Sequence, residues 1–247
     1  IRPFPGMRLV KAYKNTEFLM SEEARTVRIL CEYLEPDRRF KALGARNAVI
    51  FFGSARIAQN PQTGRDYYGL AAELAERIAR WTTESHRDGD HYHICTGGGP
   101  GIMEAVHAGA ARVDRRLNIG LNISLPFEQH INPHVEPALA LEFHYFFMRK
   151  FWFLNLARAA VIFPGGFGTM DEVFELLTLI QTGKAERMPI VLFCTEFWET
   201  TINLRKLAEM QLISPEDLSL FRICDSVDEA FAYLVSGLEQ RHSPGLA

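Results

Sequence analysis

Short apolar segments alternate with longer amphipathic segments along most of this 247-residue chain. The apolar segments have the length of strands buried on both faces, and they lie within residues 47–56, 92–101, 118–126, 160–166 and 188–194. The amphipathic segments have the spacing of helices and occupy residues 67–81, 102–113, 146–159, 169–183 and 196–211. Strands that alternate with helices pair in parallel, and the helices cover both faces of the sheet. The sequence therefore predicts an α/β fold with a doubly wound parallel sheet.

The N-terminal part of the chain precedes this alternation. Residues 21–36 have the pattern of a helix, with Ser21 as a candidate N-cap and with Glu22 and Glu23 in the first turn. Pro36 is expected to end this helix, because proline lacks the backbone N–H that a helix interior needs. We expect residues 1–45 to form a helical extension that packs on a main domain of residues 46–240.

The charge and hydropathy patterns argue against two classes of partner. The net charge of −3 disfavours binding to a nucleic-acid backbone, which usually needs a clustered basic excess. No apolar run reaches the ~18 residues of a membrane span, and the first residues lack the apolar core of a signal peptide. We therefore expect a cytoplasmic protein that binds neither nucleic acid nor membranes.

The cysteines and histidines do not have the spacing of a metal site. The four cysteines are too scattered for a CxxC pair, which favours reduced, buried thiols. His91 and His93 would share one strand face, whereas His130 and His134 flank an Asn-Pro dipeptide that disfavours a continuous helix. Neither pair completes a typical ligand set, so we expect no metal ion.

Glycines follow three of the predicted strands, at Gly53, at residues 97–101 and at residues 165–168. The carboxyl ends of parallel strands share one edge of the sheet, and α/β proteins bind ligands there. Glycine lets backbone N–H groups approach a phosphate closely, and the N-terminus of a following helix favours its negative charge. Glycines can also serve only to make tight turns. Their convergence at one edge nevertheless favours a phosphate-binding site.

Two common nucleotide-binding motifs do not fit these glycines. The dinucleotide pattern G-x-G-x-x-G would need a glycine at Ile102, and the strand that follows lacks the acidic residue that binds ribose. The P-loop pattern would need Ser or Thr after Gly183 and Lys184, where the chain has Ala185. The sequence therefore supports neither NAD binding nor an ATP-hydrolysing P-loop.

Two motifs together resemble the LONELY GUY (LOG) family, whose members are often labelled "possible lysine decarboxylase". The first is GGGPGIMEA at residues 97–105, and the second is PGGFGTMDE at residues 164–172. The second matches the family pattern PGGxGTxxE at every fixed position. The resemblance covers roughly residues 47–235, and the N-terminal extension departs from the shortest members.

The resemblance implies a Rossmann-like fold and a homodimer or larger homo-oligomer without a cofactor. It also implies hydrolysis of the N-glycosidic bond of a nucleoside 5′-monophosphate, with a purine, including a cytokinin, as the base. The catalytic pair implied by the family is Arg149, in an Arg-Lys dipeptide, and Glu172, the last residue of the second motif.

Glu172 has two interpretations. An ionised carboxylate beside the ribose stabilises the positive charge that develops when the C–N bond breaks, or it activates water. Alternatively, Thr169 and Glu172 have the spacing of a capping box, in which the glutamate bonds back to the helix entrance. The resemblance favours the catalytic interpretation.

The other candidate residues are expected to hold the substrate. The amides of Gly166 and Gly168 and the hydroxyl of Thr169 would bind the phosphate. Arg149 lies among aromatic residues and needs an anion, which is either the substrate or a structural carboxylate, and Lys150 is expected to be solvated or close to the phosphate. The predicted substrate-binding set is Gly53, Ser54, Gly98, Gly99, Met103, Lys150, Gly165, Gly166, Gly168 and Thr169.

Two other functions fit parts of the pattern. A lysine decarboxylase would normally need pyridoxal phosphate on an activated lysine, and none of the six lysines has a recognisable cofactor-anchoring pattern. A non-catalytic carrier of a nucleotide or of molybdenum cofactor would need the glycines but not Arg149 and Glu172. The joint presence of these two residues favours the enzyme.

Overall fold

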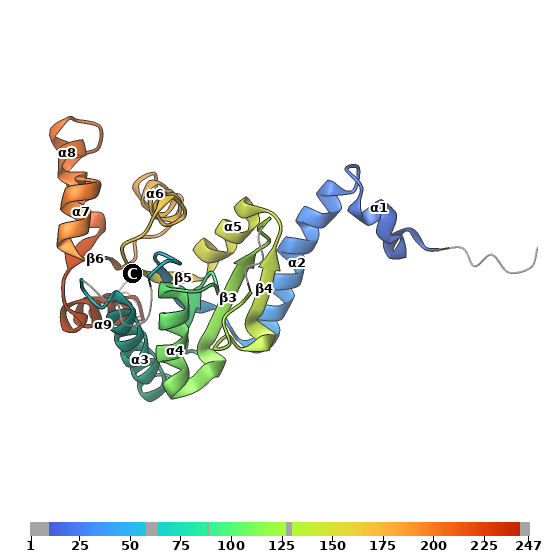
Figure 1. The fold of residues 1–247 in the computed structure, drawn as a ribbon, viewed down its shortest axis with the longest axis horizontal. Coiled ribbons are helices and arrows are strands. Elements are labelled where there is room, and N and C mark those ends of the chain that lie inside the picture. The colour runs from blue at the N-terminus through green and yellow to red at the C-terminus, as the bar shows by residue number, and fades with distance from the viewer. Residues whose placement is uncertain (1–9, 58–63, 88, 127–129, 243–247) are drawn as a thin grey trace, which may run out of the picture.

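Seven parallel strands form one sheet in the computed structural model, which describes residues 10–57, 64–87, 89–126 and 130–242 (Figure 1). The strands are β1 Asn47–Phe52, β2 Tyr92–Thr96, β3 Asn118–Ile123, β4 Ala140–Phe143, β5 Ala157–Ile162, β6 Ile190–Phe193 and β7 Arg222–Cys224. Their spatial order is β4-β3-β2-β1-β5-β6-β7, and each neighbouring pair is parallel. The direction of winding reverses between β1 and β5, which confirms the predicted doubly wound, Rossmann-like fold.

Helices cover both faces of this sheet. The helices in the described part of the chain are α1 Thr16–Met20, α2 Arg25–Leu43, α3 Tyr67–Ser85, α4 Ile102–Asp114, α5 Phe146–Leu156, α6 Phe167–Gln181, α7 Thr195–Thr201, α8 Leu204–Glu209 and α9 Val227–His242. Helices α3, α4 and α9 pack on one face, and α2, α5, α6 and α7 pack on the other. Short 3-10 helices lie at Ala12–Lys14, Arg115–Leu117, Pro137–Leu139 and Pro215–Leu220. Within the described ranges, no helix is both long and apolar enough to cross a membrane.

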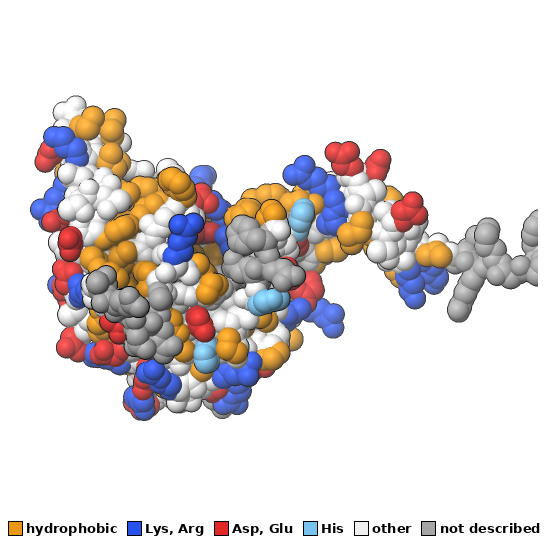
Figure 2. Space-filling model, viewed as in Figure 1, with side chains coloured by type: hydrophobic (Ala, Val, Ile, Leu, Met, Phe, Trp, Pro, Cys, Tyr) orange, Lys and Arg blue, Asp and Glu red, His pale blue; other side chains and the backbone are white. Residues whose placement is uncertain are grey.

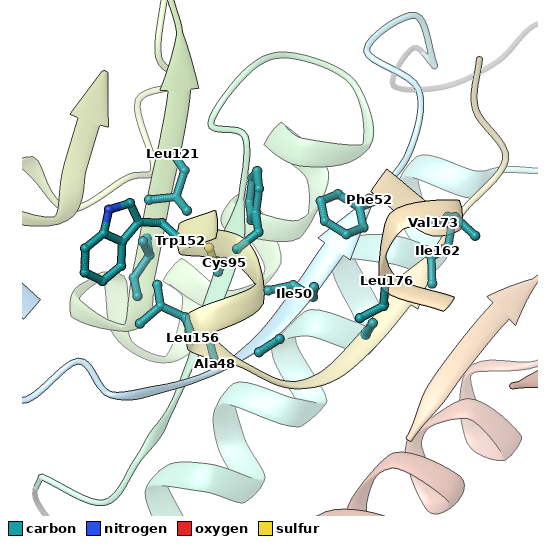
Figure 3. Close-up of a cluster of buried hydrophobic side chains, with 14 of the residues drawn as sticks. Ala48, Ile50, Phe52, Cys95, Leu121, Trp152, Leu156, Ile162, Val173 and Leu176 are labelled. Carbon is teal, nitrogen blue, oxygen red and sulfur yellow. The ribbon is translucent and has the colours of Figure 1, made fainter. Parts of the chain in front are cut away.

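The central strand β1 supplies both halves of the core because its side chains alternate between the two faces. Ala48, Ile50 and Phe52 pack with α5 and α6, whereas Val49 and Phe51 pack with α3 and α4. Figure 3 shows the first of these clusters, in which side chains of α5 and α6 close over the strands. The labelled helical residues of this cluster are Trp152, Leu156, Val173 and Leu176. The core thus fixes α5 and α6 relative to β1.

The prediction that Pro36 ends the N-terminal helix is wrong. Helix α2 runs from Arg25 to Leu43 with a buried Pro36 inside it, and it ends at Gly44 in the left-handed conformation (φ 68°). Proline cannot donate the helical hydrogen bond to the carbonyl four residues earlier, which belongs to Glu32. The indole Nε1–H of Trp152 in α5 donates to that carbonyl instead, over 2.9 Å. A tertiary contact therefore compensates for the lost helical bond.

The predicted helix at residues 196–211 is two helices. Asn203 separates α7 from α8, because its backbone is left-handed (φ 46°) and its side chain accepts a hydrogen bond from the N–H of Lys206 as an N-cap. Strands β4 and β7 and helix α9 were not indicated by the sequence pattern. Both of these strands are short and lie at the edges of the sheet, where periodicity gives little signal.

Replacement of Ile50 by alanine should lower the free energy of unfolding by about 2–5 kcal/mol, since Ile50 is fully buried between the sheet and α5–α6. Urea denaturation followed by circular dichroism measures this change. Leu212→Ala is the matched control, because Leu212 is 65% exposed, and its effect should stay within about 0.5 kcal/mol. Equal effects of the two substitutions would contradict the packing described here.

Candidate functional site

The three glycine loops meet at the carboxyl edge of the sheet. The N–H of Ser54, after β1, donates to the carbonyl of Pro164, after β5, over 3.1 Å. The carbonyl of Ser54 in turn accepts from the N–H of Ile102, after β2, over 3.1 Å. A Cβ atom on Gly101 would lie 2.4 Å from the Ser54 carbonyl oxygen, and one on Gly53 would lie 2.7 Å from the Ile102 side chain. Side chains at these two glycines would therefore force the loops apart.

A buried ion pair lies beside this junction. The guanidinium of Arg149, on α5, donates from Nη2 to Oε1 of Glu172, on α6, over 3.2 Å. Their side chains are only 14% and 8% exposed. Gly97 adjoins the pair, since a Cβ atom on it would lie 3.9 Å from Arg149 Nη1 and 2.9 Å from Met103 Sδ. The structure thus brings Met103, Arg149 and Glu172 together around Gly97.

Arg149 has unused capacity for hydrogen bonds. A guanidinium carries five N–H donors, yet the Nε of Arg149 is buried without a partner among the described residues. The guanidinium carbon lies 5.1 Å from the ring centre of Phe146 and 5.7 Å from that of Phe153. Burial lowers the pKa of Arg149, and the charge of Glu172 opposes that effect. The guanidinium can therefore donate hydrogen bonds to a further anionic or polar ligand.

Glu172 is poised to exchange a proton near neutral pH. Burial raises the pKa of its carboxyl to about 7, against the opposing charges of Arg149 and Lys150. The neighbouring carboxylates of Asp171 and Glu175 raise it further. A carboxyl whose pKa is close to the working pH suits acid–base catalysis, and such shifts are common at functional sites.

The capping-box interpretation of Glu172 is wrong. Helix α6 begins at Phe167, with Gly166 as its N-cap. Thr169 is therefore inside the helix and not at its entrance, and Glu172 lies in the second turn. The carboxylate bonds to Arg149 on a neighbouring helix.

Lys150 is not solvated, in contrast to one of the two expectations for it. Its side chain is 16% exposed, and its Nζ lies 2.7 Å from Oδ1 of Asp171 and 2.9 Å from Oε2 of Glu175. These two carboxylates flank Glu172 in the sequence of α6. Lys150 therefore ties α5 to α6 next to the Arg149–Glu172 pair, and its contact with substrate stays a prediction.

The N-terminus of α6 has the form of an anion site. The first three N–H groups of a helix have no partner within it, and here they belong to Phe167, Gly168 and Thr169. Thr169 is buried, and a Cβ atom on Gly165 would lie 2.1 Å from its hydroxyl oxygen. Gly166 and Gly168 face open space. The loop is thus tightly folded on one side and open to a ligand on the other.

The loop at Gly98 and Gly99 is held by a residue that the sequence did not single out. Asn132 donates to the carbonyl of Gly98 from its backbone N–H over 2.7 Å and from Nδ2 over 3.0 Å. Its Nδ2 also lies 3.2 Å from the carbonyl oxygen of Gly99. Because a trans peptide directs its N–H opposite to its carbonyl, the N–H of Gly99 points away from Asn132.

His107 completes this support from the core. Its Nε2 lies 3.1 Å from the carbonyl oxygen of Ile119, and its Nδ1 lies 3.1 Å from Nδ2 of Asn132. Burial lowers the pKa of His107 to about 4, so the ring is neutral at pH 7 and can accept the amide hydrogen of Asn132. The two residues lie 25 positions apart, and no motif links them.

Exposed aromatic side chains lie on the two helices that carry the ion pair. Phe146 and Phe147 on α5 are about half exposed, and Phe167 at the start of α6 is 97% exposed. Figure 2 shows hydrophobic side chains gathered over α5 and α6.

The described residues include no group of three or more side chains that could hold a metal ion.

The raised pKa of Glu172 makes the free energy of unfolding depend on pH. The folded state holds the proton more tightly than the unfolded state, so this group's contribution should fall by up to about 3 kcal/mol as pH rises from about 4.5 to about 7. Urea unfolding of the wild type and of Glu172→Gln across this range isolates the effect. Parallel pH profiles for the two proteins would show that the carboxyl titrates normally.

Comparison with known proteins identifies the family and supports the fold. The sequence matches the family described as "possible lysine decarboxylase" over residues 103–234, more than half of the chain. The fold resembles the molybdenum cofactor binding protein from the phototrophic bacterium Rippkaea orientalis, with a TM-score of 0.51 and 17% identity over 77% of this chain and 97% of that chain. No curated protein sequence gives a significant match. The chain therefore belongs to the "possible lysine decarboxylase" family, which includes the LOG proteins.

Proposed function

We propose that this protein hydrolyses the N-glycosidic bond of a nucleoside 5′-monophosphate to a free base and ribose 5-phosphate. The observation that carries the proposal is the buried Arg149–Glu172 pair next to the N-terminus of α6. Family membership supports it, because characterised LOG proteins have this activity. The family suggests that the base of this nucleotide is a purine, a class that includes N6-modified adenines.

The phosphate would bind at the start of α6. Its negative charge is favoured by the helix N-terminus and by the free N–H groups of Phe167, Gly168 and Thr169. Glu172 lies five residues beyond Phe167, which is about 7.5 Å of helical rise. A ribose whose 5′-phosphate rests on the first turn could therefore present its anomeric carbon near the Glu172 carboxyl.

The bond-breaking step needs a negative charge beside the sugar. As the C1′–N bond lengthens, the ribose becomes oxocarbenium-like, and the ionised carboxylate of Glu172 stabilises it. The base leaves with the electron pair of the C1′–N bond and takes up a proton from solvent. Water then forms the new C1′–O bond and loses a proton to Glu172, which returns that proton to solvent. A pKa of about 7 suits a group that alternates between the two states.

Arg149 would hold the reacting groups in place. Its bond to Glu172 orients the carboxylate, and its unpartnered Nε can donate to a ribose hydroxyl or to a phosphate oxygen. The half-exposed ring of Phe146 packs over the same guanidinium and offers an aromatic face to a departing base.

Decarboxylation of lysine has little support in the lysines themselves. Lys150 is occupied by two carboxylates. The remaining lysines are exposed on the surface and not in the desolvated surroundings that activate a Schiff-base lysine. They are Lys11, Lys14, Lys41, Lys184 and Lys206.

A binding protein without turnover is the second candidate, and its support is the fold shared with a molybdenum cofactor binding protein. A carrier would use the glycine loops to bind a phosphate-bearing ligand, but it would not need a carboxyl with a pKa near 7. Release of base from a nucleoside monophosphate distinguishes the two candidates.

Glu172→Gln should lower kcat for release of adenine from AMP by at least ~100-fold, because the amide cannot carry the negative charge. AMP should still bind, which calorimetry measures. Glu239→Gln, an exposed change on α9, is the control and should keep the wild-type kcat. Near-normal turnover in Glu172→Gln would remove Glu172 from the reaction.

AMP should be preferred over adenosine by a factor of ~100 or more in kcat/KM, about 2.7 kcal/mol. The reason is that the 5′-phosphate anchors the sugar at the start of α6, and binding at this remote group helps to position the ring. Adenine release from both compounds, measured at equal enzyme concentration, gives the ratio. Equal values would exclude the phosphate site proposed here.

A further inference from the structure

Helix α2 has two apolar stripes, and the other residues that the structure describes pack against only one of them. The inner stripe contains Ile29, Pro36 and Phe40, which pack against the body of the protein, with Phe40 5.3 Å from the ring of Trp152. The outer stripe is Val27, Leu30, Cys31 and Leu34, which all face solvent. Its spacing of three and four residues is that of a helix–helix seam.

The outer stripe lies on an arm that projects from the molecule. Figure 1 shows α1 and the first half of α2 extending away from the sheet. Helix α1 contains no buried residue. Arg28 fixes the corner between α1 and α2, because its Nη1 donates to the carbonyls of Leu19 and Ser21 over 2.7 and 2.6 Å. The arm is therefore held in place but has no core of its own.

We propose that the outer stripe of α2 packs against the same stripe of a second copy, with the two helices antiparallel. A two-fold axis between Leu30 and Cys31 places Val27 of one copy opposite Leu34 of the other. It also places Leu30 opposite Cys31 of the second copy. The stripe is thus complementary to itself about one axis, as an isologous interface requires.

The charges at the two ends of the stripe favour this direction. The same axis brings Glu23, in the turn just before α2, close to Arg38 of the other copy, and both side chains are exposed. Arg38 forms no ion pair with any residue that the structure describes. A parallel pairing would instead bring Arg38 beside Arg38 and Glu23 beside Glu23, which like-charge repulsion disfavours.

The same helix contacts the element that carries Arg149. On the side of α2 away from the outer stripe, the carboxylate of Glu32 accepts hydrogen bonds from the N–H groups of His144 and Tyr145 over 2.8 and 3.2 Å. These groups immediately precede α5, so Glu32 ties α2 to the entrance of that helix. Pairing of two α2 helices would therefore stabilise the support of α5, but the interface itself does not depend on the proposed activity.

Sedimentation velocity over a range of protein concentrations tests the interface. The wild type should form a dimer through this face, and Leu30→Asp/Leu34→Asp should halve the mass of the assembly without changing the circular dichroism spectrum. Leu212→Asp, at another exposed leucine (65%), is the control and should keep the wild-type mass. A monomeric wild type, or a double variant with the wild-type mass, would overturn the proposal.

Charge reversal tests the antiparallel direction. Glu23→Arg and Arg38→Glu should each raise the dimer dissociation constant several-fold, and the combination should restore it towards the wild-type value. A double variant that dimerises no better than the weaker single variant would overturn the pairing of these residues. Cys31 provides a second readout, because it is the exposed cysteine among four. A short bis-maleimide should link two wild-type chains but not two Cys31→Ser chains.

Discussion

The buried ion pair of Arg149 and Glu172 is the interaction on which the proposed chemistry depends. Burial of two charges is costly, and their mutual attraction seldom repays that cost fully. Here burial raises the pKa of Glu172 to about 7 in spite of the adjacent guanidinium. The pair therefore contributes little to an explanation of stability, whereas its position at the sheet edge is what the proposed reaction requires.

The fold holds this pair by packing α5 and α6 on the same face of β1. Lys150 of α5 forms ion pairs with Asp171 and Glu175 of α6. The apolar cluster beneath the two helices includes side chains of the strands. The glycine loops meet at the same edge of the sheet, because a side chain at Gly53 would clash with that of Ile102 and one at Gly101 would clash with the Ser54 backbone. The open first turn of α6 then remains for an anion.

The sequence predicted the features that depend on local pattern. The central strands, the helices that follow them and the glycine loops are local, and the winding of a parallel sheet brings the loops to one edge. It could not predict the continuation of α2 through Pro36, because Trp152, which donates the compensating hydrogen bond, lies 120 residues beyond the Glu32 carbonyl. Asn132 was missed for the same reason, since it contacts Gly98 across 34 residues.

The most direct measurement is a crystal structure of Glu172→Gln with AMP bound. If the pair acts as proposed, the phosphate will accept hydrogen bonds from the backbone N–H groups of residues 167–169. The anomeric carbon will then lie against the side chain at position 172, with Arg149 in contact with the nucleotide. A nucleotide bound away from the start of α6, or with its anomeric carbon directed away from position 172, would contradict the proposed reaction.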